Sequence, residues 1–140
     1  MKINGWKEGD TCDCCGRQGL VRVLEVISND GELLQLGSDC ARRFLGMVDA
    51  KAVKGAVKAE YARLTALKVA YNAAVDATPE MKESAELTVY HQKAGTPFSQ
   101  RPARIAELRT AAHAAVEASM PASDLTDLLR FRQNPNAYAA

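Results

Sequence analysis

No stretch of this 140-residue sequence is apolar over the roughly 18 residues that a membrane-spanning helix needs. Aromatic residues make up only 6% of the chain, and its 18 basic and 17 acidic residues leave a formal net charge of +1. A charge this small argues against a strongly basic nucleic-acid coat protein and against an acidic mimic of DNA. Residues 1–6 also lack the apolar stretch of a secretory signal. The sequence therefore predicts a globular, cytoplasmic protein with no membrane partner.

The common signatures of metal-dependent and phosphate-binding enzymes are missing as well. There is no His-x-Glu motif with a downstream cysteine pair, as in zinc deaminases, and no His-Glu-x-x-His motif of metalloproteases. No glycine-rich loop precedes a Lys-Ser or Lys-Thr pair, the arrangement that cradles nucleotide phosphates. We therefore expect a protein that is not an enzyme, and keep a metal- or thiol-dependent enzyme as an alternative.

The residues that are present divide sharply near position 48. All four cysteines lie at or before Cys40, whereas 23 of the 24 alanines lie at Ala50 or later. Alanine has the highest helix propensity, so the second part should be helical. We predict an α+β protein with a zinc-finger-like module over residues 1–48 and a helical region over residues 49–140.

The first part has the pattern of turns, two strands and a short helix. Residues 20–27 are rich in β-branched side chains, and the Asp-Gly pair at 30–31 predicts a hairpin turn before a second strand at 32–36. Ser38 is suited to cap a short helix over residues 39–45. A cysteine knuckle, a β-hairpin and a helix start together predict a finger that resembles a treble clef or a zinc ribbon.

The second part has the spacing of several helices. Apolar residues at steps of three and four run through residues 49–76 and predict one long helix. Thr78 followed by Pro79 suits the start of a new helix. Three shorter helices are expected, over residues 78–94, 102–119 and 123–131.

The cysteines carry the main functional signal. Cys12 and Cys15 flank two residues and precede Gly16, a spacing at which two thiolates bind one Zn²⁺ from a tight turn. Cys40 stands at the predicted helix start, where the helix dipole favours the thiolate form that binds metal. We therefore predict Zn²⁺ as the cofactor, with Cys12, Cys15 and Cys40 as its ligands.

The sequence does not identify the fourth zinc ligand. Arg43 occupies the position, one turn after Cys40, from which a treble clef takes its fourth ligand. Cys14 is the nearest candidate, although its place between Cys12 and Cys15 makes binding of all three to one ion crowded. Further candidates for the fourth ligand are Asp10, Asp39, His91, His113 and a water molecule. A redox pair, a disulfide and an iron–sulfur cluster are rival interpretations of the same cysteines.

Cys-Asp-x-Cys-Gly-Arg, a valine-rich hairpin with Asp-Gly, and Leu-Gly-Ser-Asp-Cys-Ala-Arg-Arg-Phe-Leu-Gly follow one another over residues 10–48. This stretch resembles small cysteine-motif proteins encoded by bacteriophages, plasmids and their bacterial hosts. The resemblance implies metal binding by Cys12, Cys15 and Cys40, and it places Cys14 where relatives vary. The family is mostly of unknown function, so the resemblance implies a bacterial cell and a phage or plasmid context more than an activity.

The function expected is that of a non-catalytic zinc-binding protein with a protein or nucleoprotein partner, such as a bacterial host or defence complex that it inhibits. The alternative is a DNA- or RNA-binding accessory protein. Basic side chains near the finger would make that contact: Arg42, Arg43, Lys51, Lys54 and Lys58. A solvated helix face explains the same spacing of the lysines.

Two further features belong to the helical region. The apolar stripe of the long helix suits packing inside the chain and also pairing with a second copy, so a homodimer is a further alternative. Arg101, Arg104 and Arg109 form a second basic group, which we expect to face solvent.

Overall fold

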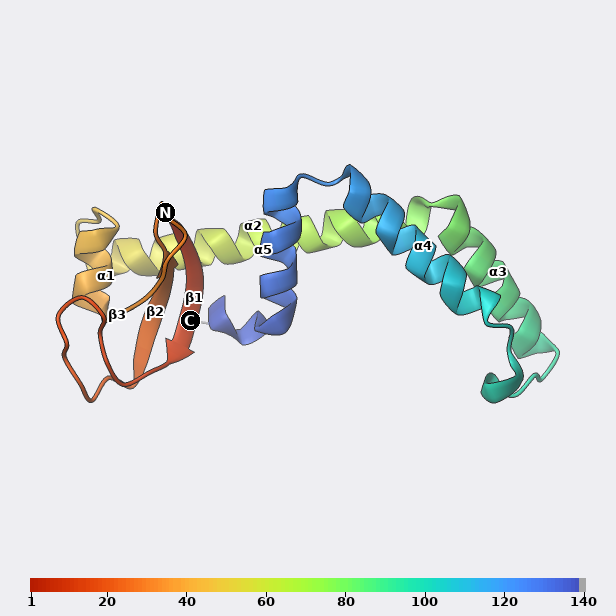
Figure 1. The fold of residues 1–140 in the computed structure, drawn as a ribbon, viewed down its shortest axis with the longest axis horizontal. Helices are drawn as coiled ribbons and strands as arrows, with labels where there is room; N and C mark the ends of the chain where they lie inside the picture. The colour runs from red at the N-terminus through yellow and green to blue at the C-terminus, as the bar shows by residue number, and fades with distance from the viewer. Residues whose placement is uncertain (139–140) are drawn as a thin grey trace. The chain divides into compact units, whose positions relative to one another are not determined.

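A computed structural model describes residues 1–138, and it confirms the α+β class: a small antiparallel sheet precedes a series of helices (Figure 1). The elements are, in chain order, β1 (Lys2–Glu8), β2 (Arg22–Ile27), β3 (Leu33–Leu36), α1 (Ser38–Phe44), α2 (Ala50–Ala77), α3 (Pro79–Lys93), the 3₁₀ helix η1 (Phe98–Gln100), α4 (Arg104–Ser119), α5 (Ala122–Gln133) and the 3₁₀ helix η2 (Pro135–Tyr138). Among residues 1–138, none of the helices combines the length and apolar character that crossing a membrane requires.

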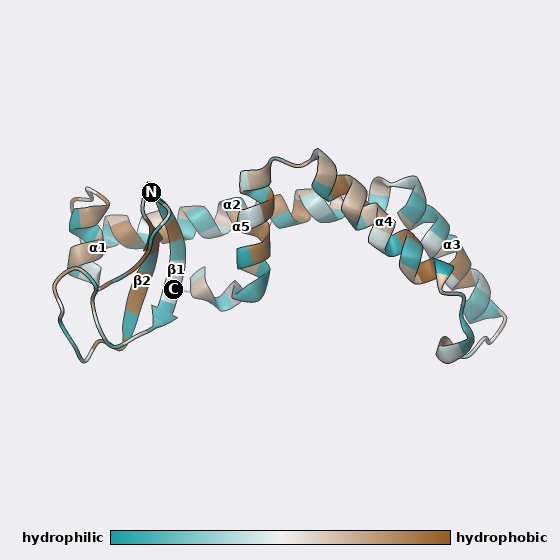
Figure 2. Ribbon diagram, in the orientation of Figure 1, coloured by the Kyte–Doolittle hydropathy of each residue, from teal (hydrophilic) through white to brown (hydrophobic). Residues whose placement is uncertain are grey.

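The sheet is built around β2, which lies between β1 and β3. Val23, Leu24 and Val26 of β2 are fully buried, and most of this strand is brown in the hydropathy view (Figure 2). The predicted hairpin is confirmed as β2 and β3, which pair antiparallel across the turn that contains Gly31. A central strand buried on both faces explains why its sequence is rich in apolar residues without strict alternation of apolar and polar positions.

β1 is a strand that the sequence pattern did not predict. Its pairing with β2 shifts register between Ile3 and Gly5, which breaks the alternation of apolar and polar residues. Gly5 has a φ of +97°, and a Cβ there would lie 2.6 Å from the carbonyl oxygen of Ala137. Glycine therefore allows the C-terminal segment η2 to pack directly on the backbone of β1.

The predicted helix starts are confirmed for the two helices that follow the finger. Asp49 Oδ1 accepts the backbone N–H of Ala52 at 2.7 Å, as expected of a residue that caps α2. Thr78 Oγ1 accepts the N–H of Met81 at 3.2 Å, and Pro79 is the first residue of α3. α2 spans 28 residues, close to the predicted range.

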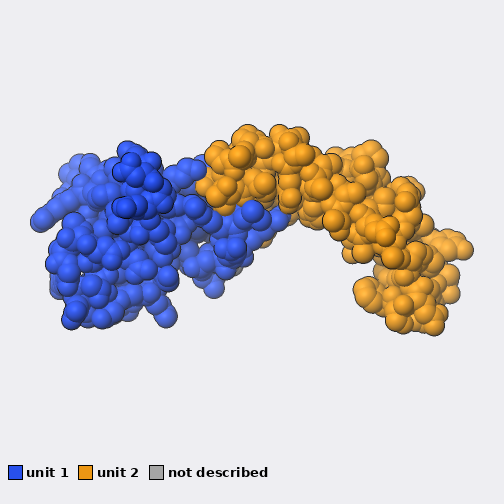
Figure 3. Space-filling view, in the orientation of Figure 1, with its two compact units in different colours: residues 1–65, 129–140 blue, residues 66–128 orange. Residues whose placement is uncertain are grey.

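The chain forms two compact units, which divide it differently from its composition (Figure 3). Unit 1 contains residues 1–65 and 129–140, and unit 2 contains residues 66–128. The sequence predicted a module ending at residue 48, but a sheet of three short strands buries too little apolar surface by itself. Side chains of α2 and of the C-terminal segment complete its core: Val53, Val57, Leu64, Phe131, Ala137 and Tyr138.

Unit 2 has a separate core made by the later part of α2 with α4 and α5. Its buried members are Tyr71, Val75, Ala112, Val116 and Leu128. α3 packs on α4 in the same unit. The buried members of the apolar stripe of α2 are therefore covered by the chain itself, Val53, Val57 and Leu64 in unit 1 and Tyr71 and Val75 in unit 2.

Candidate metal centre

The cysteine knuckle is a tight turn from Cys12 to Gly16. The N–H of Gly16 donates to the carbonyl oxygen of Cys12 at 2.8 Å, and the N–H of Cys12 donates to that of Arg17 at 3.0 Å. Gly16 has a φ of +71°, in the left-handed region that favours glycine. This turn brings the sulfur atoms of Cys12 and Cys15 within 4.8 Å of each other.

Asp13 fastens the knuckle to the edge of the sheet. Its backbone N–H donates to the carbonyl oxygen of Gln35 at 2.8 Å, and its Oδ2 accepts the N–H of Gln35 at 2.6 Å. Because β3 is an edge strand, this side of Gln35 has no neighbouring strand to pair with. Asp13 supplies that pairing and so holds the knuckle beside the segment that leads into Cys40.

Cys40 lies in the first turn of α1, as predicted. The residue that caps this helix is Gly37 and not the predicted Ser38, which is instead the first helical residue. Gly37 has no side chain to cap with, and its backbone N–H donates to the sulfur of Cys12. The start of α1 thus contacts the knuckle through the backbone and carries the third cysteine toward it.

The sulfur atoms of Cys12, Cys15 and Cys40 all lie within 4.8 Å of one another. Cys12 is buried, Cys40 is half-buried, Cys15 is exposed, and none of them forms a disulfide. Thiolates bound to one tetrahedral ion at about 2.3 Å lie about 3.8 Å apart, so a small adjustment would let all three bind the same ion. The three cysteines singled out by spacing therefore meet in space and can hold a metal ion.

The thiols of Cys12 and Cys40 hold their protons unequally. Burial opposes ionisation of Cys12, but N–H groups of Gly37, Cys15 and Cys14 donate to its sulfur and lower its pKa from 9 to about 7. Hydrogen bonds with the thiols of Cys15 and Cys12, together with burial and the thiol of Cys14, raise the pKa of Cys40 to about 12. Without a cation Cys12 therefore ionises before Cys40, and a bound cation would displace the proton that Cys40 retains.

Three of the candidates for the fourth ligand lie in the same part of the chain. The exposed Cys14 hydrogen-bonds through its thiol with Cys40, although its sulfur lies outside the group of three. Asp10 is already engaged, because its Oδ1 accepts the N–H of Gly19 at 2.9 Å. Asp39 is exposed in the first turn of α1 and does not join the group. Cys14 is thus the candidate with a direct contact to a member of the group.

The two histidines belong to unit 2 and have other partners there. His91 Nδ1 hydrogen-bonds with Thr96 Oγ1 at 3.1 Å, and His113 Nδ1 hydrogen-bonds with the hydroxyl of the buried Tyr71 at 2.8 Å. The ring of His113 also stacks on that of Tyr71. Within residues 1–138, neither histidine joins a group with the geometry of a metal site.

The basic residues near the finger differ in their surroundings. Arg42 donates through Nη1 to the carbonyl oxygen of Val48 at 3.1 Å, which gives it a role in the turn after α1. Arg43 is exposed. Three lysines near the start of α2 are also exposed, and no ion pair or hydrogen bond engages their side chains in the described chain: Lys51, Lys54 and Lys58.

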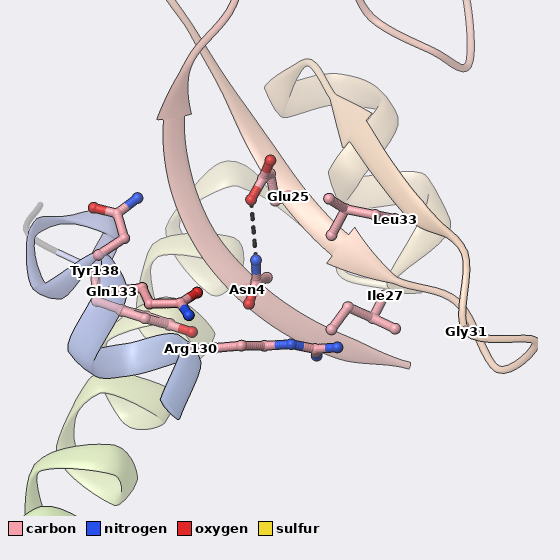
Figure 4. A pocket seen from close by; sticks show the side chains of 9 residues that line it. Asn4, Glu25, Ile27, Gly31, Leu33, Arg130, Gln133 and Tyr138 are labelled. Atoms are coloured by element: carbon pink, nitrogen blue, oxygen red, sulfur yellow. Dashed lines mark hydrogen bonds between the residues drawn. The ribbon is translucent and has the colours of Figure 1, made fainter. Parts of the chain in front are cut away.

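A second polar site in unit 1 is centred on Glu25, which is only 7% exposed on the central strand. Its Oε2 accepts a hydrogen bond from Asn4 Nδ2 at 3.0 Å (Figure 4), while its Oε1 accepts none but lies 3.3 Å from Lys7 Nζ. Glu25 and Asn4 line a cavity of about 320 Å³ whose other side is formed by Arg130 and Gln133. The buried carboxylate is thus paired within the sheet and holds β1 against β2.

Comparisons with protein-family models, with curated proteins and with solved structures found no match. The resemblance to cysteine-motif proteins of phages and plasmids therefore stays a prediction.

Asp13 is the functional residue that the sequence did not indicate, because its partner is 22 residues away. We expect the change Asp13→Ala to weaken metal binding and to destabilise unit 1 by about 0.5–1.5 kcal/mol, the usual net value of one hydrogen bond. Urea unfolding of the metal-loaded protein and competition with a chromophoric chelator measure the two effects. Asp13→Asn, which keeps an oxygen acceptor, is the matched control and should lose less. Equal stability and metal affinity of D13A and the wild type would contradict the role given to this carboxylate.

Proposed function

We propose that the chain is a non-catalytic, zinc-stabilised protein that binds a macromolecular partner. The observation that supports this most is the convergence of the Cys12, Cys15 and Cys40 thiols on one point without a disulfide. Zn²⁺ favours tetrahedral thiolate sites, and it has no redox chemistry that would disturb neighbouring thiols. A Cys-x-x-Cys turn joined to a hairpin and a helix start is typical of structural zinc sites.

The surroundings of the thiols favour a structural over a catalytic ion. Thiolate ligands donate charge to the metal and weaken its power to polarise a water molecule. A hydrolytic site would also need a general base, and the nearby carboxylates of Asp10 and Asp13 are committed to backbone N–H groups. The ion would instead hold together the knuckle, the edge of the sheet and α1.

The class of partner is supported by the resemblance alone. Residues 10–48 are similar to proteins of mobile genetic elements, whose targets lie in the bacterial cell. We propose a protein or nucleoprotein of the bacterial host, including a defence complex that binding would inhibit. In this proposal the bound ion stabilises the N-terminal finger, and surfaces outside the thiol group contact the partner.

The zinc proposal predicts one Zn²⁺ per chain and strong coupling of the ion to folding. Structural zinc sites bind with an apparent free energy of about 10–16 kcal/mol at neutral pH, comparable to the whole stability of a small domain. Metal analysis and thermal unfolding with and without a chelator measure this. The control is Cys40→Ser, which should hold zinc weakly and respond little to the chelator. A metal-free wild-type protein that melts like the purified one would refute the proposal.

We propose Cys14 as the fourth ligand, because its thiol contacts that of Cys40. Replacing zinc by Co²⁺ makes each thiolate visible as charge-transfer absorption in the near ultraviolet. We expect Cys14→Ser to remove roughly a quarter of this absorption, since it takes away one thiolate of four. Cys15→Ser gives the matched comparison for a ligand within the group of three. An unchanged cobalt spectrum in C14S would show that Cys14 is not a ligand.

A second candidate function, binding of DNA or RNA, is favoured by the three unpaired lysines of α2. Reversing the charge of Lys51, Lys54 and Lys58 to glutamate should weaken nucleic-acid binding and lower the slope of log K against log salt by about 2–3. Fluorescence anisotropy with a labelled duplex over a salt series measures this. Lys68→Glu, a charge reversal at another exposed position of the same helix, is the control for each single Lys→Glu change. Binding that does not change with salt would exclude this strip as a phosphate contact.

A further inference from the structure

An exposed aromatic ring stands beside an arginine in the turn that joins α3 to α4. The two helices pack against each other, and η1 lies in the segment between them (Figure 1). Phe98, the first residue of η1, is 86% exposed, and the Cζ atom of Arg101 lies 5.7 Å from its ring centroid. An aromatic ring left in water next to a cation is typical of a surface that a partner covers.

A groove of about 240 Å³ adjoins this ring. The residues that line it include the apolar Pro102 and Ile105 and the basic Arg101 and Arg109. No aspartate or glutamate lines it among the described residues. The groove therefore combines apolar surface with positive charge.

Arg109 is held in place by a buried serine. Ser84 of α3 is fully buried, and its Oγ donates to the carbonyl oxygen of Ile105 at 3.1 Å. The same Oγ accepts a hydrogen bond from Arg109 Nε at 3.3 Å. The bond engages Nε and leaves the two terminal nitrogens of the guanidinium available for an anion.

Arg101 is held in a similar way, whereas Arg104 is not available. Arg101 Nε donates to the carbonyl oxygen of Thr96 at 3.5 Å. Arg104 makes two hydrogen bonds to Glu83, at 3.0 and 2.7 Å, and its charge is thereby compensated. No carboxylate pairs with Arg101 or Arg109 in the described chain. Of the three arginines predicted to face solvent, two thus line a groove with uncompensated charge.

We propose that this groove binds single-stranded nucleic acid, with a base stacked on Phe98 and backbone phosphates on Arg101 and Arg109. A flat exposed ring beside guanidinium groups is the combination that proteins use for unpaired bases and their phosphates. The proposal deepens the proposed function by naming a class of partner. It rests on that function only in requiring a macromolecular partner, because the groove lies in unit 2 and the thiols lie in unit 1.

The test uses the full, zinc-loaded chain and a fluorescein-labelled oligothymidine of about ten nucleotides, followed by anisotropy over a salt series. Phe98→Ala should weaken binding by about five- to hundredfold, the range for loss of one stacked base. Arg101→Ala and Arg109→Ala should each lower the slope of log K against log salt by about 0.7. Circular dichroism of each variant checks that the helices remain folded.

Further variants distinguish binding in the groove from attraction to the overall charge of the protein. Arg104→Ala removes the same charge from the same segment but leaves the groove unchanged, so it should bind like the wild type. Phe98→Trp keeps a stacking ring, so it should retain binding, and the added indole fluorescence should be quenched by the oligonucleotide. Charge reversal at Lys51, Lys54 and Lys58 should leave this binding within about twofold if the groove is the site.

The inference would be overturned by no binding of the oligonucleotide at low salt, by binding of Phe98→Ala equal to that of the wild type, or by equal losses in R104A and R109A. Tighter binding of a glutamate-rich peptide than of the oligonucleotide, with the same dependence on Phe98, would make the groove a peptide site and would also overturn it. Failure here with one zinc per chain leaves the zinc proposal standing. If the purified chain holds no zinc but still binds the oligonucleotide through Phe98, the zinc proposal fails and the groove proposal stands.

Discussion

The paired hydrogen bonds between Asp13 and Gln35 are the constraint on which the finger depends, because they join the cysteine turn to the sheet. The chain runs from Gln35 into α1, so a knuckle fixed at this point faces the helix that carries Cys40. Cys12, whose sulfur accepts the N–H of Gly37, is also a buried member of the unit 1 core. An ion bound by the thiols would therefore act directly on the packing of this core, and metal and fold would be stabilised together.

The division of the chain follows from the size of the sheet. The central strand of this small sheet is buried on both faces, and α1 is the one helix that the residues before position 48 provide to cover it. The first turns of α2 supply Val53, Val57 and Leu64, and the C-terminal segment returns to add Phe131 and Tyr138. The compositional boundary near residue 48 marks where helix propensity changes, whereas the boundaries of the units mark where the two cores end. One long helix contributes to both cores because its stripe continues through Tyr71 and Val75.

Local signals predicted what depends on neighbours in the sequence. β-branched runs and an Asp-Gly turn were enough for the hairpin, capping residues for α2 and α3, and cysteine spacing for the group of three thiols. The sequence did not predict β1, because its bulge removes the alternation of apolar and polar residues. Its packing also depends on Ala137, which is far along the chain. The role of Asp13 was not predicted for a related reason. An aspartate between cysteines indicates no particular contact until the fold brings Gln35 beside it. A periodic sequence pattern does not say which distant residues pair with each other.

The same limit explains why three arginines of equal appearance differ in role. Helical spacing gives the face on which a residue lies, but it does not say which charge a neighbouring helix compensates. Arg104 meets Glu83 across 21 residues of sequence, and Arg109 meets Ser84 across 25. A carboxylate neutralises the first guanidinium, whereas a serine hydroxyl only orients the second and leaves its charge in place. An arginine of α4 that pairs with the carboxylate of α3 thus stabilises the helix pair. An arginine that contacts the serine of α3 remains able to bind an anion.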